Sequence, residues 1–323
     1  MLEPPITFLM PVKNGAQFLR VSRGQLSPML RACDELIIIN DHSTDESEFL
    51  IQDWVSEKGA NVRLINNPGS GLVDALNLGI AEATHRWIAR FDVDDEYHPS
   101  RIEIQSKALK NNVVAVFSDY EFISATNESL GYVYSAIFDP AVSLSLISGQ
   151  RTAHSSVIFN RDAVLSVGGY RKEDFPAEDL SLWLRLSRIG SLHSIPEVLL
   201  RYRITPTSIT STTRKTMLIK KNDLLSTIGL NPSDIKRFRD SGLDAFAEYA
   251  SHPNGLLRQA LLIRDLRAAQ MTFTTNEIAH FAGVMLSNTI KHPYQMRAAI
   301  AQVSTRISRN RYRQKITPKN SLS

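Results

Sequence analysis

The sequence predicts an α/β fold built on a mostly parallel sheet, and three observations predict it. Short apolar runs alternate with helical patterns through the first third of the chain, as strands and helices do in such folds. Polar clusters follow several of these apolar runs directly. The chain has 323 residues of ordinary globular composition, a length that suits one large α/β unit with an extension.

The amino-terminal half shows the alternation most clearly. A first strand is expected over Ile6–Met10, ended by Pro11, and the next helix carries Leu19 and Leu26 on one side. Ser43 and Glu46 have the spacing of a capping box, which predicts a helix start there with Phe49, Leu50 and Trp54 facing inward. Further strands are predicted at 36–39, 62–65, 87–91 and 113–117, and further helices at 72–83 and 100–111.

Beyond residue 117 the regular alternation stops. Strands are predicted at 130–134, 155–159 and 198–202, and helices at 143–147, at 161–167 and from 178 to about 190. From residue 214 the chain changes character, so a boundary is expected between a domain at 1–213 and a helical extension at 214–323.

The stretch Trp87–Phe91 is the centre of this pattern, because it ends in Asp92, Asp94 and Asp95. Clustered carboxylates raise one another's pKa unless a cation joins them, and oxygen ligands favour Mg²⁺ or Mn²⁺. A solvated acidic turn is one alternative. A calcium loop is another, although Tyr97 occupies the position at which that loop needs glycine.

Other polar residues are expected at the same edge of the sheet. Pro11 to Asn14 follow the first predicted strand, and Asp41 follows the second. Ligands of open α/β sheets bind beyond the carboxyl ends of the strands, so this edge suits a nucleotide beside a metal ion. Glu178 and Asp179 lie in the first turn of a later helix, where they could simply complement the helix dipole.

Taken together, these motifs resemble the family 2 inverting glycosyltransferases of the GT-A fold, in which a Rossmann-like, mostly parallel sheet is flanked by helices. The resemblance runs from Ile6 to about Thr210 and rests on the order of eight weak motifs. They are Pro11–Gly15, Asn40–Asp45, Ala75–Gly79, Asp92–Asp95, His154–Val157, Gly168–Tyr170, Glu178–Asp179 with Leu182–Trp183, and Tyr202–Arg203.

The resemblance implies a role for each matching residue. It makes Asp94 the metal ligand, for Mn²⁺ or Mg²⁺, and Asp179 the catalytic base. It places the nucleotide, with uridine as the first choice and dTDP and GDP donors as alternatives, against Pro11, Val12, Asn14, Asp41, Asn77, Asp92 and Val93. It places the acceptor or the diphosphate near Asp95, His154, Glu178, Trp183 and Arg203, although a structural role for His154 stays open.

The chain departs from the family pattern at three positions. Lys13 stands where the family often has Tyr, Asn40 where it often has Asp, and Thr205 where it often has His. The first two bear on which nucleotide binds, and the third on whether this loop closes over the diphosphate.

Composition adds expectations about location and partners. The single Cys33 gives no intramolecular disulfide, and there is no signal peptide, so a cytoplasmic enzyme is expected. Residues 291–319 carry Lys and Arg but no Asp or Glu, and an apolar stripe precedes this tail. The stripe either packs on the parent domain or attaches the protein peripherally to anionic lipid at the inner face of the membrane. No motif supports nucleic-acid binding.

The predicted activity is metal-dependent transfer of a sugar from a nucleotide-sugar donor to a glycan or lipid-linked acceptor, in surface-polysaccharide biosynthesis. Two alternatives stay open at this point. One is a nucleotidyltransferase, which shares the metal and the nucleotide but does not need Asp179. The other is a non-catalytic protein that binds nucleotide sugars on the same fold.

Overall fold

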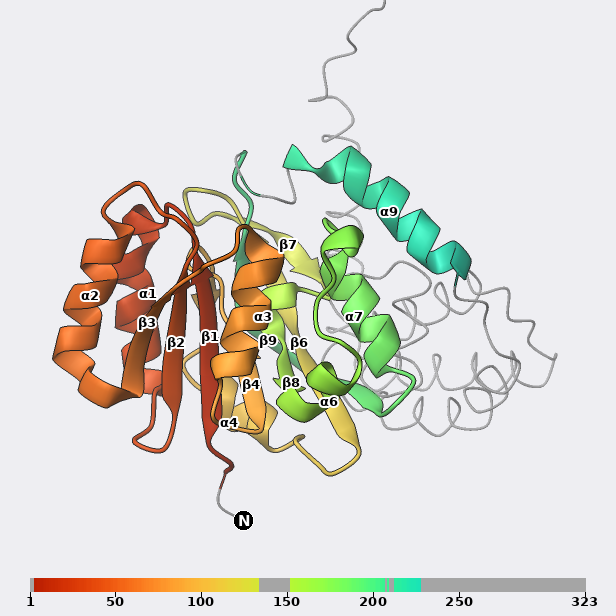
Figure 1. Cartoon of the computed structure of the whole chain (residues 1–323), viewed down its shortest axis with the longest axis horizontal. Helices are drawn as coiled ribbons and strands as arrows, with labels where there is room; N and C mark the ends of the chain where they lie inside the picture. The colour runs from red at the N-terminus through yellow and green to blue at the C-terminus, as the bar shows by residue number, and fades with distance from the viewer. Residues whose placement is uncertain (1–2, 134–151, 207, 209–211, 228–323) are drawn as a thin grey trace, which may run out of the picture. The chain divides into compact units, whose positions relative to one another are not determined.

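A computed structural model describes residues 3–133, 152–206, 208 and 212–227. The described strands form one mixed sheet in the order β3-β2-β1-β4-β8-β6-β9-β5, and β7 pairs with β6 (Figure 1). The pairs β1/β2, β2/β3 and β1/β4 are parallel, whereas β8 runs antiparallel to both β4 and β6. The sheet is therefore parallel in its first half, as predicted, and mixed in its second.

The elements have the following bounds. The strands are β1 Ile6–Val12, β2 Glu35–Asn40, β3 Val62–Asn66, β4 Trp87–Arg90, β5 Glu96–Tyr97, β6 Val113–Ile123, β7 Ser129–Val133, β8 Ile158–Asn160 and β9 Ser191–Arg203. The α-helices are α1 Ala16–Met29, α2 Ser47–Lys58, α3 Leu72–Glu82, α4 Arg101–Ser106, α6 Arg161–Ser166, α7 Glu178–Leu186 and α9 Arg214–Thr227. Short 3-10 helices are η1 Gly59–Asn61, η2 His154–Ser156 and η3 Lys172–Asp174.

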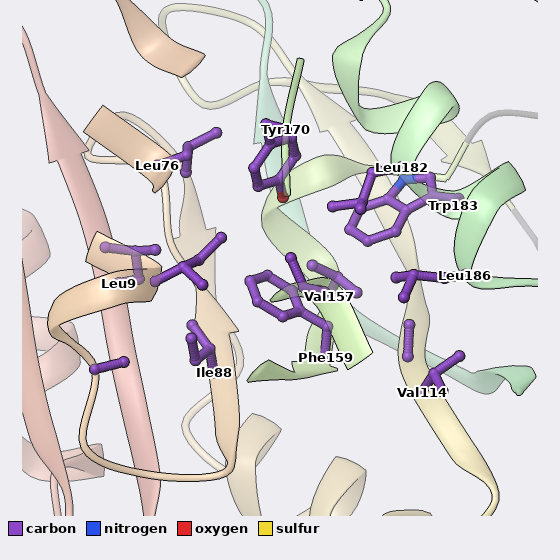
Figure 2. Close-up of a cluster of buried hydrophobic side chains, with 14 of the residues drawn as sticks. Leu9, Leu76, Ile88, Val114, Val157, Phe159, Tyr170, Leu182, Trp183 and Leu186 are labelled. Atoms are coloured by element: carbon purple, nitrogen blue, oxygen red, sulfur yellow. The ribbon is translucent and has the colours of Figure 1, made fainter. Parts of the chain in front are cut away.

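Helices cover both faces of the sheet. Successive residues of a strand point to opposite faces, so each strand contributes side chains to both cores. On β1, Leu9 belongs to a core shared with α3, α6 and α7, whereas Phe8 and Met10 belong to a core shared with α1, α2 and α4. Figure 2 shows the first of these cores, with Ile88 of β4 on the same side of the sheet as Tyr170 and Trp183. This alternation fixes which side chains at the strand ends lie beneath α7.

The predicted end of the first strand at Pro11 is wrong, since β1 continues to Val12 and Pro11 is in register with Ile39. The Leu9 carbonyl accepts from Phe91, so Leu9 and Pro11 both direct their main-chain groups toward β4. Because β4 ends at Arg90, opposite Leu9, no ladder bond is lost where proline has no N–H.

The predicted capping box is also wrong. Helix α2 begins at Ser47, and the Ser43 hydroxyl accepts instead from the main-chain N–H of Asn14 at 3.0 Å. Phe49 does not face inward, because 69% of its surface is exposed, while Trp54 is buried as expected.

Several other predicted bounds differ from the structure. The predicted helix at 100–111 is shorter, and the strands predicted at 113–117 and 198–202 are parts of the longer β6 and β9. Strands β6 and β9 pair in parallel over most of their length, which extends both beyond their most apolar segments.

Most of the predicted helical extension lies outside the described residues, as do the tail and the helix predicted at 143–147. The boundary at residue 213 and the membrane role of the tail stay predictions. In the part of the chain that the structure describes, no helix is both long enough and apolar enough to cross a bilayer.

Candidate active site

Asp41 lies buried just beyond the end of β2. Its carboxylate accepts from the Asn67 side chain at 2.8 Å and from the main-chain N–H of Gly71 at 3.0 Å. The ammonium group of Lys13, just beyond β1, lies 3.4 Å from the same carboxylate. The ends of β1, β2 and β3 are thereby tied together at one edge of the sheet. Gly71, at φ 89°, has a conformation that favours glycine.

The loops after β1 and β2 are joined to each other. The Asn14 side chain accepts from the main-chain N–H of Thr44 at 2.8 Å, and the main-chain N–H of Asn14 donates to Ser43. Asn14 and His42 both have left-handed backbones, with φ of 52° and 56°. Left-handed backbone outside glycine is uncommon and clusters at functional sites, which agrees with a binding role for this edge.

The acidic loop follows β4 at the same edge, and strands on both sides of it exclude the helix-flanked calcium loop. Asp92 forms a 2.7 Å ion pair with Arg90, which is buried. Burial, and then the charge of Asp92, raises the pKa of Asp94 to about 6. Arg90 and Arg203 oppose this shift, and a bound cation would oppose it further.

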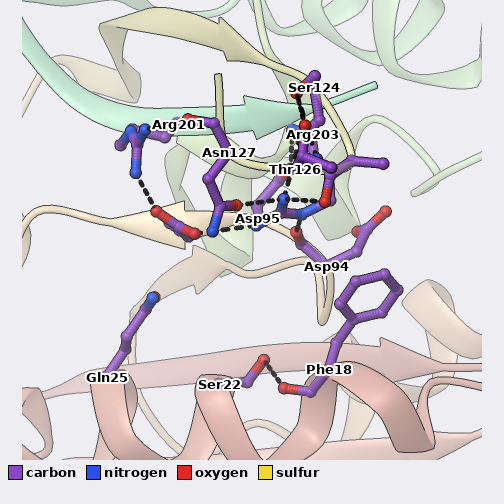
Figure 3. Close-up of polar contacts among 12 residues, drawn as sticks. Phe18, Ser22, Gln25, Asp94, Asp95, Ser124, Thr126, Asn127, Arg201 and Arg203 are labelled. Carbon is purple, nitrogen blue, oxygen red and sulfur yellow. Dashed lines mark hydrogen bonds and ion pairs between the residues drawn. The ribbon is translucent and has the colours of Figure 1, made fainter. Parts of the chain in front are cut away.

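Asp95 serves a different purpose, because it is enclosed. Its carboxylate accepts from the Ser155 hydroxyl and, at 2.8 Å, from the main-chain N–H of Arg203. Arg203 in turn donates from Nε to the carbonyl of Asp94 at 2.7 Å and from Nη2 to Glu96 at 2.9 Å. Figure 3 shows this arrangement, with Phe18, Ser22 and Gln25 of α1 on the other side of the loop. The acidic loop is therefore held in shape by the end of β9.

Glu178 and Asp179 open α7, where the cis peptide bond between Phe175 and Pro176 precedes them. Burial, and then the charge of Asp179, raises the pKa of Glu178 to about 8, and one of its carboxylate oxygens has no hydrogen-bond partner among the described residues. Burial also raises the pKa of Asp179, which is half-buried, whereas Lys221 and Arg90 lower it. Helix α7 is joined to the acidic loop through η2, since Ser155 donates to Asp95 and the neighbouring His154 packs against Trp183.

His154 lies beneath these groups. Its Nε2 is 2.7 Å from the Tyr170 hydroxyl, and burial followed by the charge of Arg90 lowers its pKa well below the ordinary value. Its ring packs edge-on against Trp183, which has no exposed surface. Trp183 is thus a core residue that supports His154, and its predicted place near the acceptor or the diphosphate stays a prediction.

Asn77 has a bracing contact. Its amide group donates to the carbonyl of Tyr170 and accepts from the N–H of Tyr170, both at 2.9 Å, which joins α3 to the turn at Gly168–Tyr170. A side chain on Gly169 would lie 2.7 Å from the Asn77 oxygen, so this approach needs a glycine. The nucleotide contact predicted for Asn77 stays a prediction.

With this geometry established, comparison with known proteins gives the family. The family model described as glycosyl transferase family 2 matches residues 7–172, just over half of the chain. The chain belongs to this family. It is a glycosyltransferase, which replaces both alternatives raised by the sequence, the nucleotidyltransferase and the non-catalytic binding protein.

Relatives of this family 2 glycosyltransferase carry the same class of name. It is 28% identical over 224 residues to an uncharacterised glycosyltransferase of Rickettsia prowazekii, covering 65% of this chain and 67% of the relative. It is 30% identical over 184 residues to the amylovoran biosynthesis glycosyltransferase AmsE of Erwinia amylovora, covering 53% of this chain and 64% of AmsE.

A solved structure confirms the fold class of this glycosyltransferase. The mannosyltransferase PcManGT of Pyrobaculum calidifontis, determined with GDP-Man and Mn²⁺, superposes with a TM-score of 0.57 at 15% identity. The match covers 94% of this chain and 86% of that one. At this identity the likeness concerns the fold alone.

The structure of this glycosyltransferase brings most of the predicted site residues to one edge of the sheet. Two contributors were not predicted from sequence, namely Arg90 and the Asn67–Gly71 segment that contacts Asp41. An arginine within an otherwise apolar strand is the signal that could have identified Arg90, since a buried arginine needs a partner. The roles assigned to individual residues stay predictions.

Proposed function

We propose that this glycosyltransferase moves a sugar, with inversion, from a nucleotide-sugar donor to a hydroxyl group of a glycan or lipid-linked acceptor in surface-polysaccharide biosynthesis. One observation carries the proposal. The acidic loop after β4 and the helix that begins with Glu178 and Asp179 are joined through η2, because Ser155 donates to Asp95 and the neighbouring His154 packs against Trp183 of α7. A donor site and a base are the two parts that inverting transfer needs side by side.

The donor end of the site is the edge formed by Asp41 and Asp92. Asp41 presents a buried carboxylate, already oriented by Asn67 and Gly71, to the N–H groups of a base. Lys13 beside it offers a donor to a base carbonyl. Asp92, oriented by Arg90, is placed for the ribose hydroxyls. Uridine is the base implied by family resemblance, and GDP and dTDP are the alternatives.

The residues present fit a divalent cation. Asp94 supplies a carboxylate whose pKa is raised by burial and by the charge of Asp92, and a bound cation would offset both. The described residues contain no group of three or more metal-ligating side chains, so Asp94 would share Mn²⁺ or Mg²⁺ with phosphate oxygens of the donor, a common way of holding such ions. When bound, the cation would supply Lewis-acid stabilisation of the leaving diphosphate.

Asp179 is the proposed base on the acceptor side. It lies in the first turn of α7, half-buried, with its pKa raised toward the working range of a general base. An acceptor hydroxyl that loses its proton to Asp179 as it attacks, on the side opposite the diphosphate, gives inversion in one displacement. Glu178 is buried with its pKa raised to about 8, which supports assigning it a contact with the acceptor rather than this proton transfer.

The acceptor class has separate support. AmsE is named for amylovoran biosynthesis, and an acceptor carried on lipid fits the basic tail at residues 291–319. Removal of Tyr294–Ser323 is expected to release the protein from anionic vesicles at low salt. If the full-length chain does not bind such vesicles, this attachment is wrong while the transfer reaction is untouched.

Screening nucleotide sugars for thermal stabilisation tests the proposal, since a ligand that binds only the folded state raises its stability. We expect one class of nucleotide sugar to raise the melting temperature with Mn²⁺ or Mg²⁺ and to do so less without it. Acceptor fractions from surface polysaccharide and from lipid-linked glycans then identify the second substrate by release of the nucleoside diphosphate. A chain that no nucleotide sugar stabilises, with or without a cation, would overturn the proposal.

A further inference from the structure

Arg90 is a charged residue in a place that normally holds an apolar one. It is the last residue of β4, and 1% of its surface is exposed. Its main-chain N–H donates to Val157 at 3.0 Å, and its carbonyl accepts from Arg101 at 3.0 Å. The side chain is thus attached to a backbone fixed from two sides.

The pleat of the sheet determines where this side chain points. Ala89 and Phe91 belong to the core beneath α1, whereas Ile88 belongs to the core beneath α3 and α7. Arg90 is two residues after Ile88, so its side chain leaves the strand on the same face as Ile88, the face covered by α3 and α7.

The guanidinium contacts Asp92 and the carbonyl of Phe91, and its Nε–H has no partner among the described residues. Nη2 lies 2.7 Å from Asp92, and Nη1 donates to the carbonyl of Phe91. Nε is buried and has no hydrogen-bond partner among the described residues. One oxygen of Glu178 is unpartnered in the same sense. A buried polar atom without a hydrogen-bond partner costs free energy, so these two atoms indicate a functional role for Arg90 and Glu178.

The charges around Arg90 are unbalanced. Its guanidinium pairs closely with Asp92, and its positive charge favours the ionised forms of Glu178 and Asp179. A single guanidinium therefore acts on three carboxyl groups, one from the acidic loop and two from the start of α7.

We propose that Arg90 is a positioning residue shared by the two halves of the site: its guanidinium orients the carboxylate of Asp92 toward the donor and supplies the fixed positive charge for the carboxyl pair Glu178–Asp179. This inference rests on the proposed function for the donor half. The interaction of the Arg90 charge with Glu178 and Asp179 needs no bound donor, so it does not rest on the proposed function. Arginine suits the task, because its planar fork can hold Asp92 with one edge and keep another donor free.

The test compares Arg90→Met and Arg90→Lys with the parent chain and with Arg86→Met. Arg86 is an exposed arginine just before β4, so its variant controls for loss of an arginine as such. The first measurement is calorimetric affinity for UDP and for GDP in the presence of Mn²⁺. We expect Arg90→Met to weaken binding by roughly 10- to 100-fold, the usual effect of losing a partner that orients a ligand-binding group. Arg90→Lys should recover part of this loss, and Arg86→Met should match the parent.

Two double-mutant cycles separate positioning from general support of the fold. Asp92→Asn should add little to the affinity lost in Arg90→Met, since both remove the same orientation. Glu178→Gln should raise the melting temperature at pH 8.5 more in the Arg90→Met background than in the parent, because the carboxylate there has lost its cation.

The outcomes are distinct. Folded Arg90→Met protein with parental affinity, or with additive effects in both cycles, overturns the inference and leaves the proposed function standing. If the parent chain binds neither UDP nor GDP, the same measurement is made with dTDP, and a parent chain that binds none of the three overturns the donor half together with the proposed function. If Arg90→Met does not fold, Arg90→Lys decides by the same affinity and cycle criteria.

Discussion

The carboxylate of Asp95 accepts a hydrogen bond of 2.8 Å from the main-chain N–H of Arg203, a residue 108 positions later in the chain. The Arg203 side chain returns to the same loop through the carbonyl of Asp94. This reciprocal contact joins the acidic loop after β4 to the end of β9. Of the three clustered aspartates, Asp95 is therefore the one that shapes the loop, whereas the binding roles of Asp92 and Asp94 stay predictions.

Asp95→Ala is expected to lower the free energy of unfolding by roughly 2–4 kcal/mol, because it leaves the main-chain N–H of Arg203 and the hydroxyl of Ser155 without an acceptor. Chemical denaturation measures this. Glu103→Ala is the control, since Glu103 pairs with Lys107 on the surface and should cost under about 0.5 kcal/mol. Equal stability of the two variants would show that the contact does not support the loop.

Asp94→Ala is expected to abolish the Mn²⁺-dependent part of nucleoside diphosphate binding while the protein stays folded. The carboxylate is the proposed protein ligand to the cation, and its raised pKa reflects charge that the cation would compensate. Calorimetry with and without Mn²⁺ measures the effect. Asp162→Ala, on the exposed surface of α6, should behave as the parent. Unchanged affinity in Asp94→Ala under both conditions contradicts the metal assignment.

Asp41→Ala is expected to weaken binding of a nucleoside diphosphate but not of inorganic diphosphate. The reason is that Asp41 lies at the ends of β1 and β2, where the base is expected, and not in the acidic loop. Competition between the two ligands at fixed Mn²⁺ separates the contributions. If Asp41→Ala loses the same affinity for both ligands, Asp41 acts on the phosphates and not on the base.

The first half of the fold could be predicted from sequence because each strand there is a continuous apolar run, which is what burial on both faces of a parallel sheet requires. Because the carboxyl ends of parallel strands share one edge of the sheet, Asp41 and the acidic loop could also be predicted to lie at that edge. Strand β6 was predicted too short because polar residues follow its apolar start, and β9 because polar residues precede its apolar end. Glu121, for example, lies beyond the predicted end of β6 and pairs with Arg201 of β9.

The contacts that complete the site could not be predicted, since they join residues far apart in the chain. Asn77 contacts Tyr170, 93 positions later, and nothing in either local sequence specifies the partner. Trp183 was assigned to the neighbourhood of the acceptor by resemblance, and its packing against Phe117 and His154 in the core was not predicted. Periodicity identifies which helix face is apolar but not how deeply each residue is buried.

Glu178→Gln is expected to change how stability depends on pH. Between pH 4.5 and about 8 the folded protein holds the Glu178 proton that the unfolded chain releases, so stability falls as pH rises through this window, by up to about 1.4 kcal/mol per pH unit. The glutamine variant lacks this contribution and should gain stability over the parent as pH rises from 5 to 8.5. Denaturation midpoints at several pH values measure it. Parallel curves for parent and variant would show that Glu178 has an ordinary pKa.

Asp179→Asn decides the catalytic assignment. The substitution keeps the shape of the side chain and its place at the start of α7 but removes the basic oxygen. Donor affinity should therefore survive while transfer falls by roughly 10²–10⁴-fold, the usual contribution of a positioned base. Sugar transfer to the acceptor and donor affinity are both measured.

Glu178→Gln is the matched control for this variant, since it makes the same chemical change one residue earlier. Glu178 is buried with its pKa raised to about 8, so at neutral pH its carboxyl group is mostly protonated and unsuited to accept a proton. Asp179 is half-buried, and both Arg90 and Lys221 favour its ionised form. The glutamine variant should thus retain more activity than Asp179→Asn. If Glu178→Gln is the more damaged of the two, the base is Glu178, and bound substrate must lower its pKa below that of the free enzyme.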